Sequence, residues 1–217
     1  MGSSNEVATG DSEGLIPRML IDLFDQLPQL QQAESSDDND RPSFTVKVSF
    51  LEVYGDIVRD LLVPESSGVS LGLREDKITG RVSVQGLQEI QIASPQEALE
   101  RFCQGSKNRV TGATSVNNTS SRSHAVFTIC LELGDGRRSK LTCVDLAGSE
   151  RLDKTGAEGQ RLREGIHINT GLLFLGQVIN ALADDQRIKS GTLGFVPYRR
   201  SKLTHLLKVR LHVWRRR

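Results

Sequence analysis

The run Asn117-Asn118-Thr119-Ser120-Ser121-Arg122-Ser123-His124 and the later run Asp145-Leu146-Ala147-Gly148-Ser149-Glu150 decide how this chain of 217 residues is interpreted. Both runs are polar and both adjoin apolar segments. Residues 126–133 follow the first run, and residues 140–144 lead into the second. Binding groups of α/β proteins gather in loops at the ends of such strands. We therefore expect the two runs to converge from neighbouring strands on one pocket.

The residue types in these runs suit a sensor of a nucleotide's γ-phosphate. Such a sensor offers hydroxyls to Mg²⁺ or its waters and N–H groups to phosphate oxygens, and it releases them after hydrolysis. Ser120 and Ser121 supply hydroxyls, and the Asp145 carboxylate can hold Mg²⁺ through water. Gly148 has no Cβ, so its backbone can approach a phosphate closely. Either run alone could equally be an ordinary loop or turn, but the pair in this order favours the sensor.

Arg122 and Glu150 carry opposite charges that could latch the two runs together. On an exposed surface such a pair contributes about 0–1 kcal/mol. Partly desolvated at ~4 Å, its gross Coulomb attraction is nearer ~4 kcal/mol at an effective dielectric of about 20, before desolvation is subtracted. Only the partly desolvated pair would be strong enough to drive a switch.

The rest of the chain mixes strand-like and helix-like patterns, which predicts an α/β fold. Alternating apolar residues predict a strand at 44–50, and Gly55-Asp56 predicts a turn before a short helix that ends near Leu62. Two more strands, 126–133 and 140–144, flank a hairpin turn at Asp135-Gly136. Helices are expected over about 16–27, after a capping box at 94–97, over about 168–182 behind a polar loop at 151–165, and from about Ser201.

Composition narrows the possible partners. The chain has 28 Lys and Arg against 27 Asp and Glu, so it is no general polyanion binder, and nucleic acid is not an expected partner. No apolar run approaches the ~18 residues that a membrane span needs. We divide the chain into a polar N-terminal segment (1–13), one domain (14–207) and a basic tail (208–217).

Further motifs make the chain resemble the kinesin motor domain over most of residues 14–207. Residues 49–54 (Ser-Phe-Leu-Glu-Val-Tyr) with 60–62 (Asp-Leu-Leu) are similar to a core strand and turn of that family. Residues 168–176 look like its relay helix, and 196–204 (Val-Pro-Tyr-Arg-Arg-Ser-Lys-Leu-Thr) like its microtubule-facing loop and helix. Gly171, where many kinesins have serine, favours the chromokinesin branch.

The resemblance implies ATP-driven movement on microtubules by a protein of the cytoplasm and cytoskeleton. It implies a partial kinesin motor fold, a mixed sheet flanked by helices as in P-loop NTPases, with ATP and Mg²⁺ as cofactors. The nucleotide-binding residues would be Asn117, Ser120, Ser121, Asp145 and Gly148, with Ser120 and Asp145 nearest the metal. The catalytic set would be Ser120, Ser121, Arg122, Gly148 and Glu150, and the tubulin-facing set Arg163, Lys189, Tyr198, Arg199, Lys202 and Lys208.

The chain also departs from the family pattern. Gly-x-x-x-x-Gly-Lys-Ser/Thr, the loop that cradles phosphates, does not occur in it. We expect the sequence to begin just downstream of that loop, which leaves the strand 140–146 without its central neighbour and with an exposed edge. Arg200 stands where an acidic residue is usual, and the likeness stops after Leu207.

Three interpretations remain open at this level. The chain is part of a kinesin-type ATPase, a non-catalytic microtubule-binding fragment, or a truncated gene product without ATPase activity. The sequence gives no oligomeric state.

Overall fold

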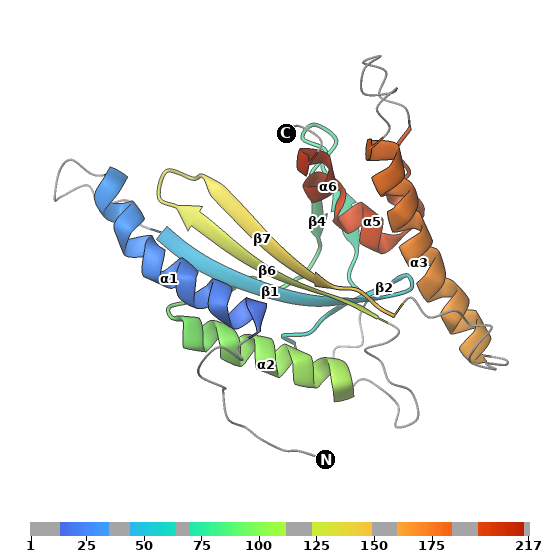
Figure 1. The fold of residues 1–217 in the computed structure, drawn as a ribbon, viewed down its shortest axis with the longest axis horizontal. Helices are drawn as coiled ribbons and strands as arrows, with labels where there is room; N and C mark the ends of the chain where they lie inside the picture. Colours follow the sequence, from blue (N-terminus) through green and yellow to red (C-terminus); the bar gives the residue numbers. More distant parts are fainter. Residues whose placement is uncertain are drawn as a thin grey trace. The chain divides into compact units, whose positions relative to one another are not determined.

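A computed structural model of the chain describes residues 14–34, 44–63, 70–111, 123–148, 160–183 and 195–214 (Figure 1). The chain forms two compact units. The first contains residues 1–48, 89–103 and 128–143, and the second contains 49–88, 104–127 and 144–217. Almost every residue discussed below as functional belongs to the second unit.

Among the described residues, helices and strands are mixed along the chain, in keeping with the predicted α/β fold. The strands are β1 (Phe44–Tyr54), β2 (Ile57–Asp60), β3 (Leu73–Glu75), β4 (Val82–Val84), β5 (Ile90–Ile92), β6 (His124–Leu133) and β7 (Arg138–Asp145). The helices are α1 (Leu15–Glu34), α2 (Pro95–Thr111), α3 (Gln160–Ala183), the 3₁₀ turn η4 (Tyr198–Arg200), α5 (Lys202–Leu206) and α6 (Lys208–Trp214). Helix α1 precedes β1 to β5, α2 precedes β6 and β7, and the other helices follow.

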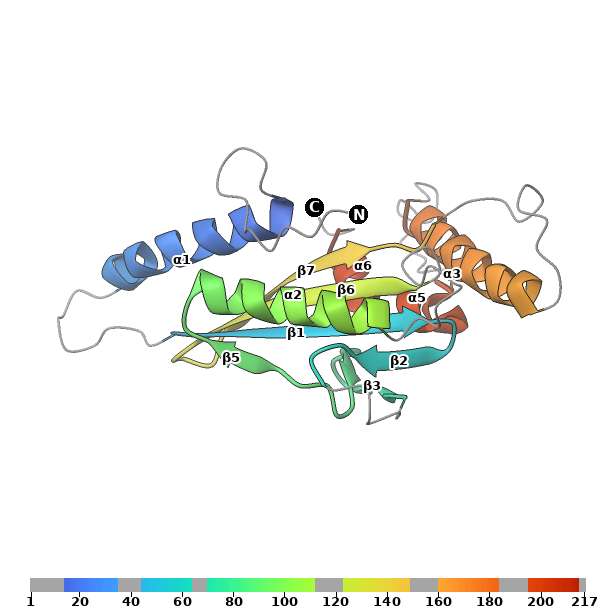
Figure 2. The ribbon, with the colours of Figure 1, turned by 90° about the horizontal axis from the view of Figure 1, so that it is seen from below.

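The main sheet has the strand order β2-β1-β6-β7, with β5 also pairing with β1 (Figure 2). Most of β1 is buried without alternation from Val48 to Val53, as expected for an inner strand covered on both faces. Among the described strands, β7 pairs only with β6, and Leu141 on it is 51% exposed. The expected exposed edge is therefore present in this part of the chain.

The segment after the Gly55-Asp56 turn is a strand, so the prediction of a short helix there was wrong. Gly55 has a φ of +56°, which an L side chain adopts only with strain. This tight turn folds β2 back antiparallel onto β1, with Tyr54 opposite Ile57 and Leu51 opposite Asp60. The local pattern alone did not show that β1 offered an edge for pairing.

The hairpin between β6 and β7 is confirmed. Gly136 has a φ of +85°, and the Arg137 N–H donates to Asp135 Oδ1 at 2.9 Å. Helix α3 begins at Gln160, inside the polar loop predicted at 151–165, and α1 continues through Pro28 to Glu34, beyond the helix expected over about 16–27. A 20-residue helix can tolerate the loss of the one backbone hydrogen bond that an internal proline removes.

Helix α2 starts as its sequence predicts and approaches the sheet closely. The Glu97 N–H donates to Ser94 Oγ at 3.1 Å, while the Glu97 carboxylate accepts from the Ala93 N–H at 2.9 Å. Further along, a Cβ on Gly105 would lie only 2.3 Å from Phe50 Cδ1. Phe50 in turn meets Phe127 edge to face, at 5.4 Å between ring centroids. A glycine is thus required where α2 crosses β1.

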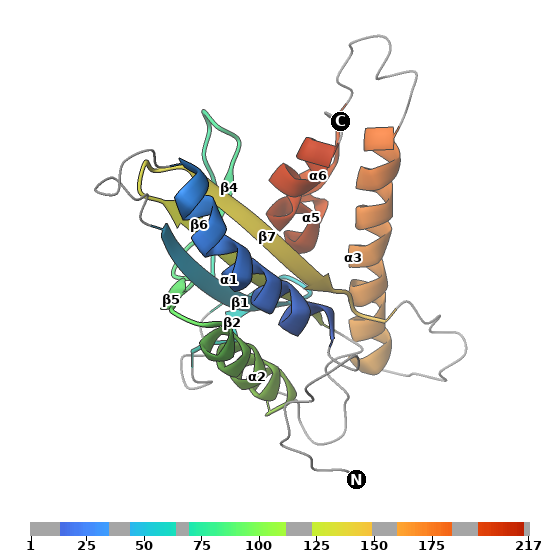
Figure 3. The ribbon, with the colours of Figure 1, turned by 60° about the vertical axis from the view of Figure 1, so that its left-hand side comes forward.

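The C-terminal helices gather beside the short hairpin β3–β4. Helix α5 contacts α3, η4 and β4, and α3 runs alongside α5 (Figure 3). Leu206 of α5 joins Leu51, Val53, Val58 and Val126 in one buried cluster. This cluster fixes α5 against the end of the sheet from which the Asp145–Gly148 turn emerges.

Candidate nucleotide-switch site and basic surface

The structure describes only part of the predicted nucleotide site. Asp145 and Gly148 lie within the described residues. Asn117, Ser120, Ser121, Arg122, Glu150 and the tubulin-facing Lys189 lie outside them, and Arg163 is in α3 without a described side chain. The predicted roles of these residues therefore stay predictions.

The two polar runs meet at the residues that are described. The Ala147 N–H donates to His124 Nδ1 at 3.0 Å, which joins the end of the first run to the Asp145–Gly148 turn. Both residues are buried, with 4% exposure each. Since Nδ1 accepts this hydrogen bond, the neutral imidazole carries its proton on Nε2. Burial, reinforced by the charge of Arg109, lowers the pKa of His124 and favours that neutral form.

Arg109, in the last turn of α2, connects the same two segments. Its Nη1 donates to Asp145 Oδ2 at 2.6 Å and its Nη2 to the Ser123 carbonyl at 2.7 Å. Its Nε lies 4.0 Å from Glu52 Oε1, and the Glu52 side chain is only 3% exposed. Arg109 was not predicted as a site residue, because a basic residue near a helix C-terminus is already explained by its favourable interaction with the helix dipole.

A cavity of about 160 Å³ lies next to His124. Thr170, Gly171 and Phe174 of α3 line one side of it, and Arg200 and Asp56 contribute charged groups. A Cβ on Gly171 would lie 3.5 Å from His124 Nε2, an ordinary contact distance. The glycine thus leaves open space beside a hydrogen-bond donor.

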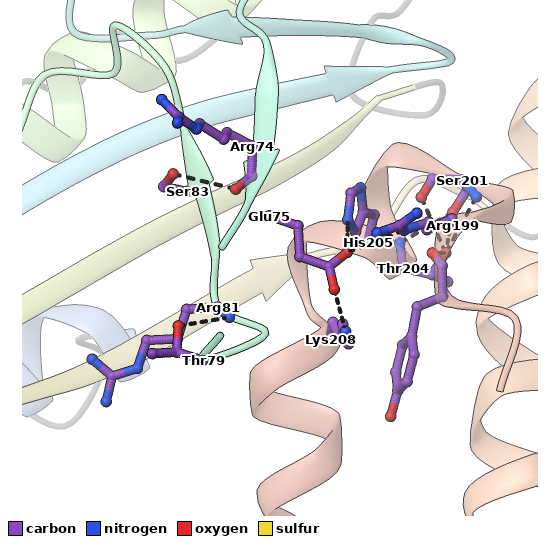
Figure 4. Close-up of polar contacts among 11 residues, drawn as sticks. Arg74, Glu75, Thr79, Arg81, Ser83, Arg199, Ser201, Thr204, His205 and Lys208 are labelled. Carbon is purple, nitrogen blue, oxygen red and sulfur yellow. Dashed lines mark hydrogen bonds and ion pairs between the residues drawn. The ribbon is translucent and has the colours of Figure 1, made fainter. Parts of the chain in front are cut away.

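The predicted tubulin-facing residues on η4, α5 and α6 differ in their exposure and in their ion pairs. Tyr198 is buried, with 7% exposure, and Lys202 is half-buried. The Arg199 side chain is 74% exposed, and the Lys208 side chain 28%. Both cations pair with Glu75 of β3 (Figure 4). Arg199 is therefore the most accessible of these groups.

Arg200, which the sequence analysis treated as a reversed charge near the track, is engaged with α3. Its guanidinium lies 4.6 Å from the centroid of the Phe174 ring, and its Nη1 donates to Gln177 Oε1 at 3.0 Å. A capping box at Ser201 starts α5, with the Thr204 N–H donating to Ser201 Oγ at 3.1 Å. The two contacts of Arg200 fasten the residues before α5 to α3, and the capping box fixes where α5 starts.

Together these features define a class of protein. A sheet strand ends in an Asp-x-x-Gly turn that touches the serine-rich run, and α3, the next described helix after that turn, packs against α5 and η4 with their basic residues. This arrangement is the one expected of a nucleotide-switch protein whose switch is connected to a binding surface. No described helix is long and apolar enough to cross a bilayer.

Comparison with known proteins identifies the family. A family model described as the kinesin motor domain matches residues 1–215, so the chain belongs to the kinesin motor domain family. It is 45% identical over 201 residues to the human chromosome-associated kinesin KIF4A, covering 90% of this chain and 15% of that protein. It is 46% identical over 204 residues to the human kinesin-like protein KIF13A, covering 90% and 11%. The chromokinesin branch expected from Gly171 is consistent with the first match.

Solved structures agree with the fold. A structure described as a fast kinesin aligns with a TM-score of 0.73 and 38% identity, over 94% of this chain and 54% of that one. A KIF14 dimer with AMP-PNP in complex with a microtubule aligns with a TM-score of 0.73 and 37% identity, over 92% and 56%. The chain thus spans just over half of these solved motor chains, and 11–15% of the two curated relatives.

Proposed function

We propose that this chain is the switch and track-binding part of a kinesin motor domain, and that it binds microtubules through the basic residues of η4, α5 and α6. The observation that carries the proposal is the packing of α3 against α5 and η4. A helix that follows the nucleotide turn is thereby in contact with the segment that presents Arg199, Lys202 and Lys208.

The charge of this segment supports an acidic partner. Arg199 is largely exposed, and Lys202 forms no ion pair with the residues that the structure describes. Exposed cations attract an acidic surface at long range, and salt screens this attraction over about 8–10 Å. Binding that weakens steeply with added salt is the expected behaviour.

The described residues fit one part of an Mg²⁺·ATP site. The Asp145 carboxylate stands at the end of β7 with its side chain 68% exposed, and it already pairs with a cationic group, Arg109. Mg²⁺ keeps several of its waters in proteins and uses one or two carboxylates, which Asp145 can provide. When bound, the ion would neutralise charge on the nucleotide's phosphates. Gly148 would offer its backbone N–H to a phosphate oxygen.

The 217 residues do not supply a phosphate cradle, because they lack Gly-x-x-x-x-Gly-Lys-Ser/Thr. The cradle provides the backbone N–H nest and the lysine that grip the β- and γ-phosphates. This observation favours a second candidate, a microtubule-binding fragment without turnover, for the 217 residues taken alone. ATP-driven movement is the proposed role of the same residues within a complete motor domain.

Co-sedimentation with microtubules and ATP turnover, measured on the same preparation, test these proposals. We expect the 217-residue chain to co-sediment, to dissociate as salt is raised, and to show no microtubule-stimulated ATP hydrolysis. Stimulated hydrolysis would refute the non-catalytic candidate, and absence of binding at low salt would refute the proposed function. Lys202→Gln should weaken binding, whereas Arg137→Gln, which removes an exposed arginine in the β6–β7 hairpin, should not.

A further inference from the structure

Glu75 binds a group of basic side chains that belong to the proposed microtubule-binding segment. Its Oε2 accepts from Arg199 Nη2 at 2.8 Å and from Arg199 Nε at 3.1 Å, and it lies 3.0 Å from His205 Nε2. Its Oε1 accepts from Lys208 Nζ at 2.5 Å. Figure 4 shows these side chains converging on Glu75 from η4, α5 and α6.

The Glu75 carboxylate is well placed to compete for these cations. Its side chain is 15% exposed, so its ion pairs are screened by solvent less than pairs on an open surface. Lys208 is held further by the Tyr198 ring, whose centroid lies 5.9 Å from its Nζ. Hydrogen bonds from Lys208, Arg199 and His205 lower the pKa of Glu75 to about 2, so its carboxylate stays ionised at neutral pH.

We propose that Glu75 acts as an internal substitute for an acidic partner, and that it sets how strongly the segment 198–208 binds that partner. The inference rests on the proposed function, because the partner is the acidic surface of the microtubule. A partner carboxylate that approaches Arg199 or Lys208 must share the cation with Glu75 or displace it. Part of the segment's positive charge is therefore neutralised before any encounter.

Glu75→Gln tests the inference, because it keeps the size of the side chain and removes its charge. We expect the variant to bind microtubules about fivefold more tightly at low salt, with a steeper loss of affinity as salt is raised. Glu89→Gln is the matched control. Glu89 also pairs with two cations, Arg138 at 3.0 Å and Lys140 at 2.7 Å, and its loss changes the net charge equally. Glu89 belongs to the other compact unit, so only an effect of overall charge should appear there.

A second measurement does not depend on the folding of the Glu75 variant. If Glu75 holds Lys208, then Lys208→Gln in the unaltered background should weaken microtubule binding by less than about twofold, as for a charge that is already neutralised. Lys202→Gln should weaken it several-fold, because no described acidic residue pairs with Lys202. Glu75→Asp keeps the negative charge, so its microtubule affinity and salt dependence should stay close to those of the unaltered chain.

The outcomes separate the inference from the function on which it rests. If the unaltered chain binds, and Glu75→Gln and Glu89→Gln then show the same affinity and salt dependence, the inference is overturned while microtubule binding stands. A loss for Lys208→Gln as large as that for Lys202→Gln overturns it as well. If no variant binds microtubules at low salt, both the proposed function and the inference fail.

Discussion

Gly171→Ser should stabilise the protein, because the new hydroxyl would reach the buried Nε2–H of His124. A Cβ at this position lies 3.5 Å from His124 Nε2, so the substitution fits without displacing a neighbour. Replacing a glycine inside a helix by alanine contributes about 0.5–1 kcal/mol. Serine is a slightly poorer helix former than alanine, by a few tenths to about 0.5 kcal/mol. A net hydrogen bond contributes about 0.5–1.5 kcal/mol.

These magnitudes predict an order of stability that depends on the hydrogen bond. At position 171, serine should exceed alanine by about 0.5 kcal/mol, because the hydrogen bond outweighs the difference in propensity. Gly176 provides the control, since it lies in the same helix and a Cβ there meets nothing within 4 Å. At position 176 alanine should exceed serine by about 0.4 kcal/mol.

Urea unfolding of the four variants, Gly171→Ala, Gly171→Ser, Gly176→Ala and Gly176→Ser, measures both differences. The double difference between the positions isolates the contact with His124 and should be about 1 kcal/mol in free energy of unfolding. If serine falls below alanine by the same amount at both positions, the hydroxyl does not reach His124 Nε2.

Four further predictions concern other contacts of the fold. Gly105→Ala should lower the free energy of unfolding by about 1–3 kcal/mol through overpacking against β1, and a variant as stable as the unaltered chain would contradict the close approach. Arg109→Met should cost about 3 kcal/mol, because it leaves a buried glutamate of β1 without its cation. Asp145→Asn should cost less than about 1 kcal/mol, since Asp145 is exposed; equal losses for the two variants in urea unfolding would contradict this ranking. Because the folded pKa of Glu75 is lowered from 4.5 to about 2, its ion pairs stabilise the fold fully above about pH 4.5, and this contribution is lost as the pH falls toward 2; Glu75→Gln should flatten the pH dependence of the melting temperature in that range.

Much of the fold could be predicted from local patterns. The alternation at 44–50, the Asp135-Gly136 turn and the capping box at 94–97 each act within a few residues, and the corresponding elements are present. The prediction failed at 57–60, where the state of the segment depends on a partner strand. The β-branched Ile57 and Val58 suit a strand, and pairing with Leu51–Tyr54 makes the segment one, but no pattern within 57–60 reports that partner.

Residues of the candidate site could be predicted from the sequence only where several polar functional groups stand together in a short run. Asp145 and Gly148 belong to such a run. Arg109 and Glu75 do not, because each acts on groups far away in the sequence and looks like an ordinary charged residue on a helix or hairpin. Charged networks of this kind form from tertiary contacts, so a single sequence gives little sign of them.

The contact of Arg200 with Phe174 changes how this chain should be compared with its relatives. A map of surface potential would count Arg200 as one more positive group facing outward, opposite in sign to the usual acidic residue. Its guanidinium is exposed, but it is also stacked on an aromatic ring of the neighbouring helix. Replacing Arg200 by an acidic residue would remove the contacts that connect two helices and would also reverse a charge. A difference between such variants in the proposed microtubule binding would therefore report helix coupling and electrostatics together, and Arg200→Gln would be needed to tell them apart.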